Sequence, residues 1–210
     1  MVIFVEILFI MFRKSLLALS IASLSAITPL SAEEKNKGVY VLGSIGAGQM
    51  NDIEFSAALG GGTAQFDGGF SGEIGLGYDF GSFRTEFSYN STNTPLDGVT
   101  DVDVDVKSFL LSAAYDWRSD KKWQPYIGAG VGSSTIDLNL GATVGGTTLT
   151  AGDDNITTVK LKAGVNYEAS EDIDVYGEIW GQGFDDFTIG LIQFTDVSVS
   201  GASLGLRVKL

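Results

Sequence analysis

The side chains that could carry chemistry in this sequence are limited to carboxylates, amines, guanidinium groups and hydroxyls. The chain of 210 residues contains no Cys and no His. Cysteine nucleophiles and Cys-based zinc sites are therefore excluded, and the usual general base of hydrolases is missing. A hydrolase built on paired carboxylates stays formally possible, but no pair is singled out by its spacing. We expect no enzymatic activity, no catalytic residue, no metal site and no cofactor.

Carboxylates are the most numerous of these groups, and they are unevenly placed. Asp and Glu number 26 against 13 Lys and Arg, giving a formal net charge of −13, which argues against a nucleic-acid partner. Thirteen of the acids, and no Lys or Arg, lie in the segments 49–69, 90–106, 134–156 and 181–197. The acidic patch that we consider comprises Asp101, Asp103, Asp105, Asp153, Asp154, Asp185 and Asp186. One interpretation is that this patch only keeps the surface soluble. The other is that it attracts cations or a binding partner.

The first 32 residues have the pattern of a secretory signal peptide. Arg13 and Lys14 form a short basic region, an apolar stretch follows, and Ala32 is a small residue at the expected cleavage point. Residues 1–10 are apolar and precede the basic region, so we predict that they are an extension of the gene model upstream of a true start at Met11. A longer, uncleaved anchor is the alternative.

The rest of the chain alternates between two kinds of residue. After a short stub at 33–37, we predict one β-domain over 38–210 that makes up the whole mature protein. Eight runs have a period of two and are separated by breaks rich in Gly, Asn and Asp. They lie at residues 38–48, 70–80, 83–89, 109–117, 123–133, 159–168, 175–180 and 203–210. Most runs have one apolar face and one polar or small face, but the two faces of the first run are too similar to distinguish.

The connections between the runs alternate in length. Short breaks lie at 79–82, 118–122 and 169–172, and the four acidic segments are the long ones. Aromatic residues lie near the short breaks: Tyr78, Phe80, Phe83, Trp117, Trp123 and Tyr167. With an exporting signal, these features favour a closed eight-stranded antiparallel transmembrane β-barrel with short periplasmic turns, long extracellular loops and an aromatic girdle. The alternative is a soluble barrel or sandwich, in which the charged faces of the strands would form the outer surface.

The eight runs, the phrase PYIGAGVG and the C-terminal GASLGLRVKL resemble the eight-stranded outer-membrane β-barrels of OmpA, OmpX and Opa type, a porin-like family. The resemblance covers roughly residues 39–210. It implies a place in the bacterial outer membrane, contact with outer-membrane lipid, and recognition of the last strand by the barrel-insertion machinery. That strand usually ends in Phe or Trp in the family, whereas this chain ends in Leu210. Enzymes with related barrels rely on a His, which this chain lacks.

Polar faces that point inward would place ten charged side chains in the barrel interior. They are Glu73, Glu86, Asp116, Glu168 and Glu178, and Arg84, Lys160, Lys162, Arg207 and Lys209. Side chains fill an eight-stranded barrel and confined charges must pair, so we predict a salt-bridged plug. The alternative is a narrow, gated path along Gly75, Gly77, Gly128, Gly130, Gly132 and Gly164.

Residues 101–106, DVDVDV, are the most suggestive part of the acidic segments. Alternation would place three carboxylates on one face of a strand. The run is not an EF-hand loop, because its position 6 is Val106 and its position 12 is Ser112. We predict a strand that extends above the membrane, with weak Ca²⁺ or Mg²⁺ binding or contact with an extracellular partner. The predicted role is therefore structural or surface interaction through acidic loops, with a small porin-like channel for ions or solutes as the alternative.

Overall fold

The structure is a computed structural model. It describes residues 37–57, 60–98, 101–117, 122–140, 146–150, 155–189 and 192–210. The predicted signal peptide, most of the stub, and Asp153 and Asp154 of the acidic patch lie outside the described residues. Within the described ranges, no helix is long and apolar enough to cross a membrane.

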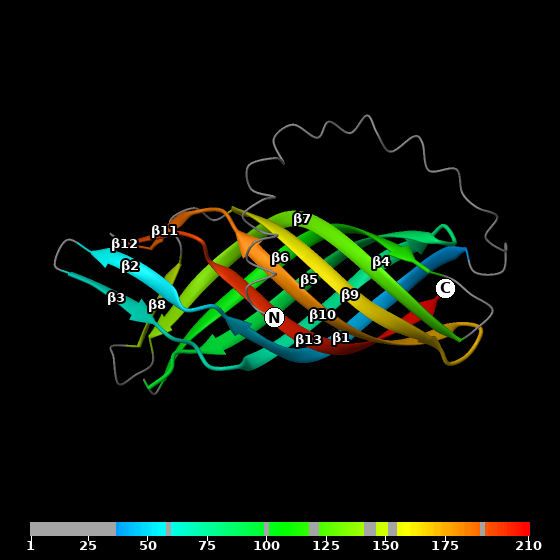
Figure 1. The fold of residues 1–210 in the computed structure, drawn as a ribbon, viewed down its shortest axis with the longest axis horizontal. Coiled ribbons are helices and arrows are strands. Elements are labelled where there is room, and N and C mark those ends of the chain that lie inside the picture. Colours follow the sequence, from blue (N-terminus) through cyan, green and yellow to red (C-terminus); the bar gives the residue numbers. More distant parts are fainter. Residues whose placement is uncertain are drawn as a thin grey trace, which may run out of the picture. The chain divides into compact units, whose positions relative to one another are not determined.

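Eight long strands form a closed antiparallel barrel (Figure 1). They are β1 (Gly38–Met50), β4 (Gly69–Asp79), β5 (Phe83–Pro95), β6 (Val102–Asp116), β7 (Trp123–Leu140), β9 (Ile156–Glu168), β10 (Ile173–Phe184) and β13 (Ser198–Lys209). Their order is β6-β5-β4-β1-β13-β10-β9-β7, and pairing of β6 with β7 closes the ring. Closure leaves no open strand edge for lipid to face, as a spanning sheet requires. The predicted fold class is confirmed.

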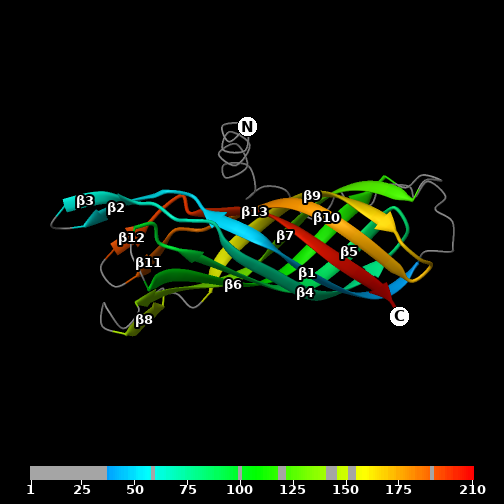
Figure 2. The same ribbon diagram turned by 90° about the horizontal axis from the view of Figure 1, so that it is seen from below.

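Five short strands lie in the long connections, where the sequence pattern had predicted loops. They are β2 (Ile53–Ala57), β3 (Gly60–Ala64), β8 (Thr147–Thr150), β11 (Phe187–Ile189) and β12 (Ile192–Phe194). Four of them form a separate sheet in the order β11-β12-β2-β3, and β8 pairs with β7. Figure 2 shows all five at the end of the barrel away from the C terminus. Runs of three to five residues are too short for their alternation to be distinguished from a loop.

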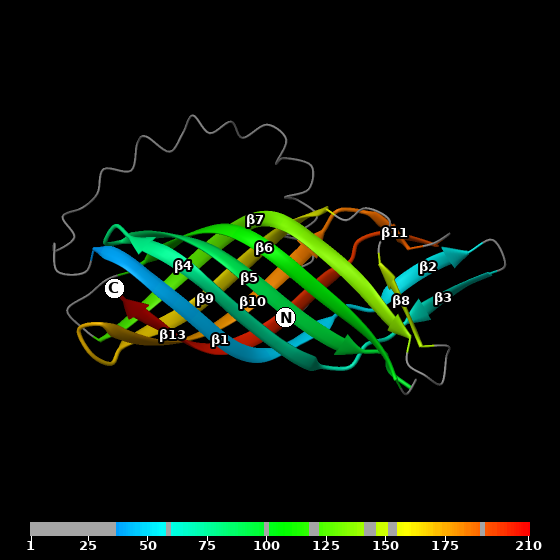
Figure 3. The same ribbon diagram turned by 180° about the vertical axis from the view of Figure 1, so that it is seen from behind.

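The short turns close the opposite end of the barrel. Figure 3 shows the start of β1 and the C terminus together there, away from β2, β3 and β8. Between β4 and β5, the Gly81 N–H donates to Asp79 Oδ1 at 2.7 Å, and Gly81 has φ of 111°. Only glycine adopts that backbone region readily, which explains the glycine in this turn.

The alternation within the barrel is inverted relative to that of a soluble protein. On β4 the outward Ile74 is 65% exposed and the inward Glu73 only 5%. On β1, whose faces the sequence left unresolved, Tyr40 and Leu42 are buried. The aromatic girdle near the short turns includes ring pairs such as Trp123 with Tyr167, whose centroids are 4.7 Å apart. An apolar outside with aromatic borders is the surface that a bilayer requires.

At the extracellular end of β6, the outward side chains become charged and the inward side chains become apolar. The outward side chain at Phe109 is apolar and exposed, but the next outward positions are Lys107 and Asp105. Inward, Val106 is 1% exposed. β6 continues to Val102, so most of the predicted strand over 101–106 is present. The change of its outward residues from apolar to charged is what the outer edge of a lipid-facing belt requires.

One detail of that prediction is wrong. Asp101 is not part of the strand, because it lies in a turn with φ of 63°, a conformation that Asp tolerates better than most residues. The Leu96 N–H donates to the Val102 carbonyl at 2.9 Å and closes the hairpin there. Two carboxylates, Asp103 and Asp105, rather than three, therefore share the outward face of β6.

Candidate functional site

Glu86 is the centre of the buried polar network inside the barrel. Its Oε1 accepts hydrogen bonds from the Tyr40 hydroxyl at 2.7 Å and from Arg84 Nε at 2.9 Å. Its Oε2 accepts one from Lys162 Nζ, and Arg207 Nε lies 3.5 Å from Oε1. One carboxylate that is only 2% exposed therefore interacts with three cations from three strands.

A second chain of contacts links the same two arginines. Arg84 Nη1 pairs with Asp116 Oδ1, which also accepts a hydrogen bond from Asn166 Nδ2 at 3.0 Å. Arg207 Nη1 donates to Asn166 Oδ1. Asn166 is thus the neutral bridge that joins the Arg207 side of the network to the Asp116 side.

Two further buried acids, Glu73 and Glu178, are held in different ways. Glu73 pairs with Lys160 from across the barrel. Glu178 accepts hydrogen bonds from the hydroxyls of Tyr126, at 2.7 Å, and Ser203, at 3.4 Å. Hydroxyl donors stabilise a buried carboxylate without bringing another charge into the barrel.

Eight of the ten charges predicted for the interior are buried there: Glu73, Glu86, Asp116, Glu178, Arg84, Lys160, Lys162 and Arg207. Glu168 and Lys209 are only half-buried and lie at the border of the plug. Lys209 Nζ donates to the main-chain oxygen of Glu171 in the 169–172 turn at 3.1 Å. Both residues occupy the last positions of their strands, at the periplasmic rim.

Three interior tyrosines were missing from the predicted network. Each lies directly opposite a glycine on a neighbouring strand: Tyr40 with Gly77, Tyr126 with Gly164, and Tyr176 with Gly205. A Cβ at those glycines would lie 2.3, 2.7 and 2.3 Å from the ring Cζ atoms. These glycines therefore make room for rings. A tyrosine on the same inward face as charged residues was the signal available in the sequence.

The tyrosine rings also cover the arginines. The Arg207 guanidinium carbon lies 4.1 Å from the Tyr176 ring centroid and 5.1 Å from that of Tyr126, and Arg84 lies 4.3 Å from the Tyr126 centroid. Cation–π contacts at such distances are favourable in a site shielded from water. At Gly77 and Gly164, two of the glycines proposed to line a solute path, the space is filled by tyrosine.

Replacing Tyr126 with Phe tests the hydroxyl contribution to the network. We expect the free energy of unfolding to fall by about 1.5–3 kcal/mol, because Glu178 loses its shortest hydrogen bond and stays buried. Urea unfolding of the reconstituted barrel, followed by tryptophan fluorescence, measures the loss. Tyr115→Phe is the matched control, since Tyr115 is lipid-facing and 42% exposed. Equal losses in the two variants would contradict the prediction.

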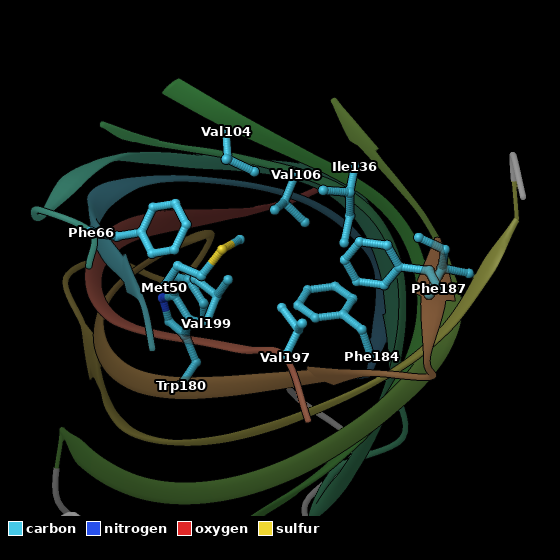
Figure 4. Close-up of a cluster of buried hydrophobic side chains, with 11 residues drawn as sticks. Met50, Phe66, Val104, Val106, Ile136, Trp180, Phe184, Phe187, Val197 and Val199 are labelled. Carbon is cyan, nitrogen blue, oxygen red and sulfur yellow. The ribbon is translucent and has the colours of Figure 1, made fainter. Parts of the chain in front are cut away.

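The extracellular half of the interior is mainly apolar, although it also includes buried hydroxyls such as those of Thr92 and Thr94. It contains a cluster of buried side chains comprising Met50, Phe66, Val104, Val106, Ile136, Ile156, Trp180, Phe184, Phe187, Val197 and Val199. In Figure 4, Val106 and Ile136 point from one wall toward Phe184 and Val197 on the other. Between this apolar plug and the charges, Gln182 Nε2 donates to Ser108 Oγ at 2.7 Å.

The outward face of the extracellular extension carries a small polar cluster. Asn93 Nδ2 donates to Asp103 and Asp105 at 2.6 and 2.8 Å, and Asn139 Nδ2 donates to the same two carboxylates at 2.9 and 3.0 Å. Beside them Lys107 Nζ lies 3.0 Å from Asp137 Oδ2, and this hydrogen bond raises the pKa of Lys107. In the described part of the chain, no three Asp or Glu side chains are placed to hold a metal ion.

The predicted acidic patch is not a single cluster. Asp103 and Asp105 lie on β6, whereas Asp185 and Asp186 are exposed in the connection that follows β10. Strands β7 and β9 separate β6 from β10 in the barrel wall. Any partner that contacts both pairs must span that distance around the rim.

Comparisons with known proteins agree with this geometry. A sequence model described as "Outer membrane protein beta-barrel domain" matches residues 15–209, and a search of curated proteins gave no match. Neisserial surface protein A has a similar structure, with a TM-score of 0.60, 22% identity, and coverage of 82% of this chain and 97% of that one. OprG from Pseudomonas aeruginosa also has a TM-score of 0.60, with 15% identity and coverage of 83% and 98%. These identities show the fold alone. By the family match, this chain belongs to the outer membrane protein β-barrel family and resides in the bacterial outer membrane.

Proposed function

We propose that this protein is a closed, non-enzymatic barrel that presents an acidic strand extension at the cell surface to a cationic extracellular partner. The observation that carries the proposal is the contrast between a filled interior and a structured acidic exterior. The interior is occupied by the buried ion pairs and then by the apolar plug. The working surface is therefore the extracellular rim.

A small channel, the second candidate, would need a continuous path of water through the barrel. Ion pairs around Glu86 occupy the periplasmic half, where Lys162 and Arg207 reach across from the far wall. The apolar plug occupies the other half, and a passage lined by such side chains excludes water and ions. A solute would have to disrupt both layers, so the geometry favours the closed barrel.

The acidic extension is well supported by its neighbours. Hydrogen-bonded pairing of β5 with β6 continues to Pro95 and Asp103, and pairing of β6 with β7 continues to Val102 and Leu140. The outward carboxylates therefore project from a three-stranded ladder rather than from a loop. Preorganised charges bind a partner with less loss of conformational entropy than charges on a mobile segment.

A fluorescent octalysine peptide is a direct probe of this surface. We expect it to bind the barrel in neutral detergent micelles, and binding to weaken with added salt. The double variant Asp103→Asn with Asp105→Asn should weaken binding about fivefold, since each exposed charge contributes a fraction of a kcal/mol. Fluorescence anisotropy measures the affinity. Glu171→Gln with Asp172→Asn removes the same charge from exposed positions at the periplasmic turn and should change binding little.

Two results would contradict the proposal. Equal weakening in both double variants would show that the peptide responds only to net charge. Stable conductance steps of the wild-type protein in planar bilayers, abolished by neutralising Lys160 and Lys162, would establish the channel instead.

A further inference from the structure

The lipid-facing wall contains a groove that neither the ion-pair network nor the acidic surface uses. It has a volume of about 690 Å³ and spans five adjacent strands, from Phe70 on β4 across β1, β13 and β10 to β9. Its outward-facing lining is apolar or glycine, and the buried Glu178 and Ser203 border it from the interior side. The bulky outward residues Ile45 and Leu204 are 66% and 69% exposed. The groove is therefore continuous with the apolar belt that contacts the bilayer.

The strand register explains why the wall is hollow at this point. Across the barrel, one row of paired outward residues reads Ala47, Ala202, Ile179 and Ala163, and the next row reads Ile45, Leu204, Gly177 and Val165. On each of these four strands, one row thus has a small residue and the other row a large one. The small residues Ala163, Gly177 and Ala202 form the floor of the groove, and the larger residues of the lining form its sides.

The position of the groove along the barrel axis places it at the level of the outer leaflet. Directly above Ala47 and Ala202, the next outward pair is Gln49 with Ser200, and both residues are polar and exposed. This pair lies at the extracellular edge of the apolar belt, one row above the groove. A hydrocarbon chain that descends from the outer leaflet would pass through the groove first.

We infer that this groove holds an acyl chain of an outer-leaflet lipid. Lipid tails are as apolar as Leu, so the site would be selective through close packing rather than through exclusion of water. A second copy of the barrel fits the groove less well. A two-fold dimer places the same patch on both partners, and a hollow facing a hollow leaves an unfilled void.

Filling the floor of the groove tests the inference. In Gly177→Leu the new Cβ would meet only the tip of the flexible Leu204 side chain, at 3.3 Å. The matched control is Gly181→Leu on the same strand, where a Cβ meets no atom within 4 Å and which lies outside the groove. Each protein is reconstituted in phosphatidylglycerol vesicles, extracted in mild detergent, and analysed by native mass spectrometry for retained lipid. We expect Gly177→Leu to retain about threefold less lipid than wild type, through lost packing contacts, and Gly181→Leu to match wild type.

Two further measurements make the result decisive. A heat-modifiable band on SDS gels shows that each variant is folded, and Ala163→Leu replaces Gly177→Leu if the latter does not fold. Because the chain has no native Cys, Ala202→Cys is a unique thiol in the groove, and Ala113→Cys is its counterpart on β6, outside the groove. Disulfide-linked dimers formed in membranes by Ala202→Cys alone would show that a second copy occupies the groove. That result, or unchanged lipid retention in the filled variant, would overturn the inference.

Discussion

Replacing Glu86 with Gln is expected to lower the free energy of unfolding by about 3–5 kcal/mol, the largest effect of any single charge in the barrel. The substitution keeps the shape of the side chain but removes the carboxylate that interacts with Arg84, Lys162 and Arg207 together. Three buried cations would then share the charge of the remaining acids. An unbalanced buried charge costs more than the original pair contributes, because water cannot reach it.

Urea unfolding of the barrel in lipid vesicles measures this loss. Glu168→Gln is the matched control, since it makes the same chemical change at a half-buried position on the periplasmic rim. We expect the free energy of unfolding to fall by less than about 1 kcal/mol, because solvent screens a charge at the rim. If both variants unfold at the same urea concentration, Glu86 is not the centre of the network.

Replacing Trp180 with Ala is expected to lower the free energy of unfolding by about 3–5 kcal/mol. The mechanism is different, because this variant loses a large buried ring rather than a charge. Trp180 belongs to the apolar plug, and its ring lies over Gly201 on the adjacent strand, where a Cβ would come within 2.6 Å of it. Lys160 Nζ lies 5.1 Å from the ring centroid. The ring therefore separates the apolar half of the interior from the charged half, and its removal opens a cavity between them.

Trp117→Ala is the control for this prediction. Trp117 is 48% exposed in the aromatic girdle, where its ring packs edge-on against Tyr115. The free energy of unfolding should fall clearly less in Trp117→Ala than in Trp180→Ala, because lipid can fill the space that the Trp117 ring leaves. Since the chain has three Trp, two fluorescent reporters remain in each variant for following unfolding. A loss for Trp180→Ala no larger than that of Trp117→Ala would contradict the proposed role of the ring.

Stacking of interior tyrosines on cross-strand glycines explains part of the glycine content of this chain. At Tyr40 and Gly77, as in the other two tyrosine–glycine pairs, one residue supplies the ring and its partner supplies the space. A barrel of eight strands is too narrow for large side chains at every inward position. The sequence therefore encodes the packing as pairs, but the two members of a pair are far apart along the chain.

The alternation of single strands was readable without a structure. A period of two separates the faces of any strand, and the exported chain with aromatic borders indicated that the apolar face points outward. Eight strands, three short turns and eight buried charges followed from this reasoning. It was less accurate at strand ends, where Asp101 lies in a turn and Lys209 reaches the rim, because alternation does not show where a strand leaves the membrane.

Sequence by itself thus determined, for most of the barrel strands, which face is polar and which is apolar, because that difference depends on local alternation. The exception is β1, whose two faces have similar residues. Tertiary structure alone decided the height at which each inward residue lies, since height depends on the register between strands. Lys162 and Glu86 are 76 residues apart in the chain, and Lys160 and Glu73 are 87 apart. Their pairing, and the change from a charged to an apolar interior along the barrel axis, follow from the hydrogen-bonded ladder that sets all eight strands against one another.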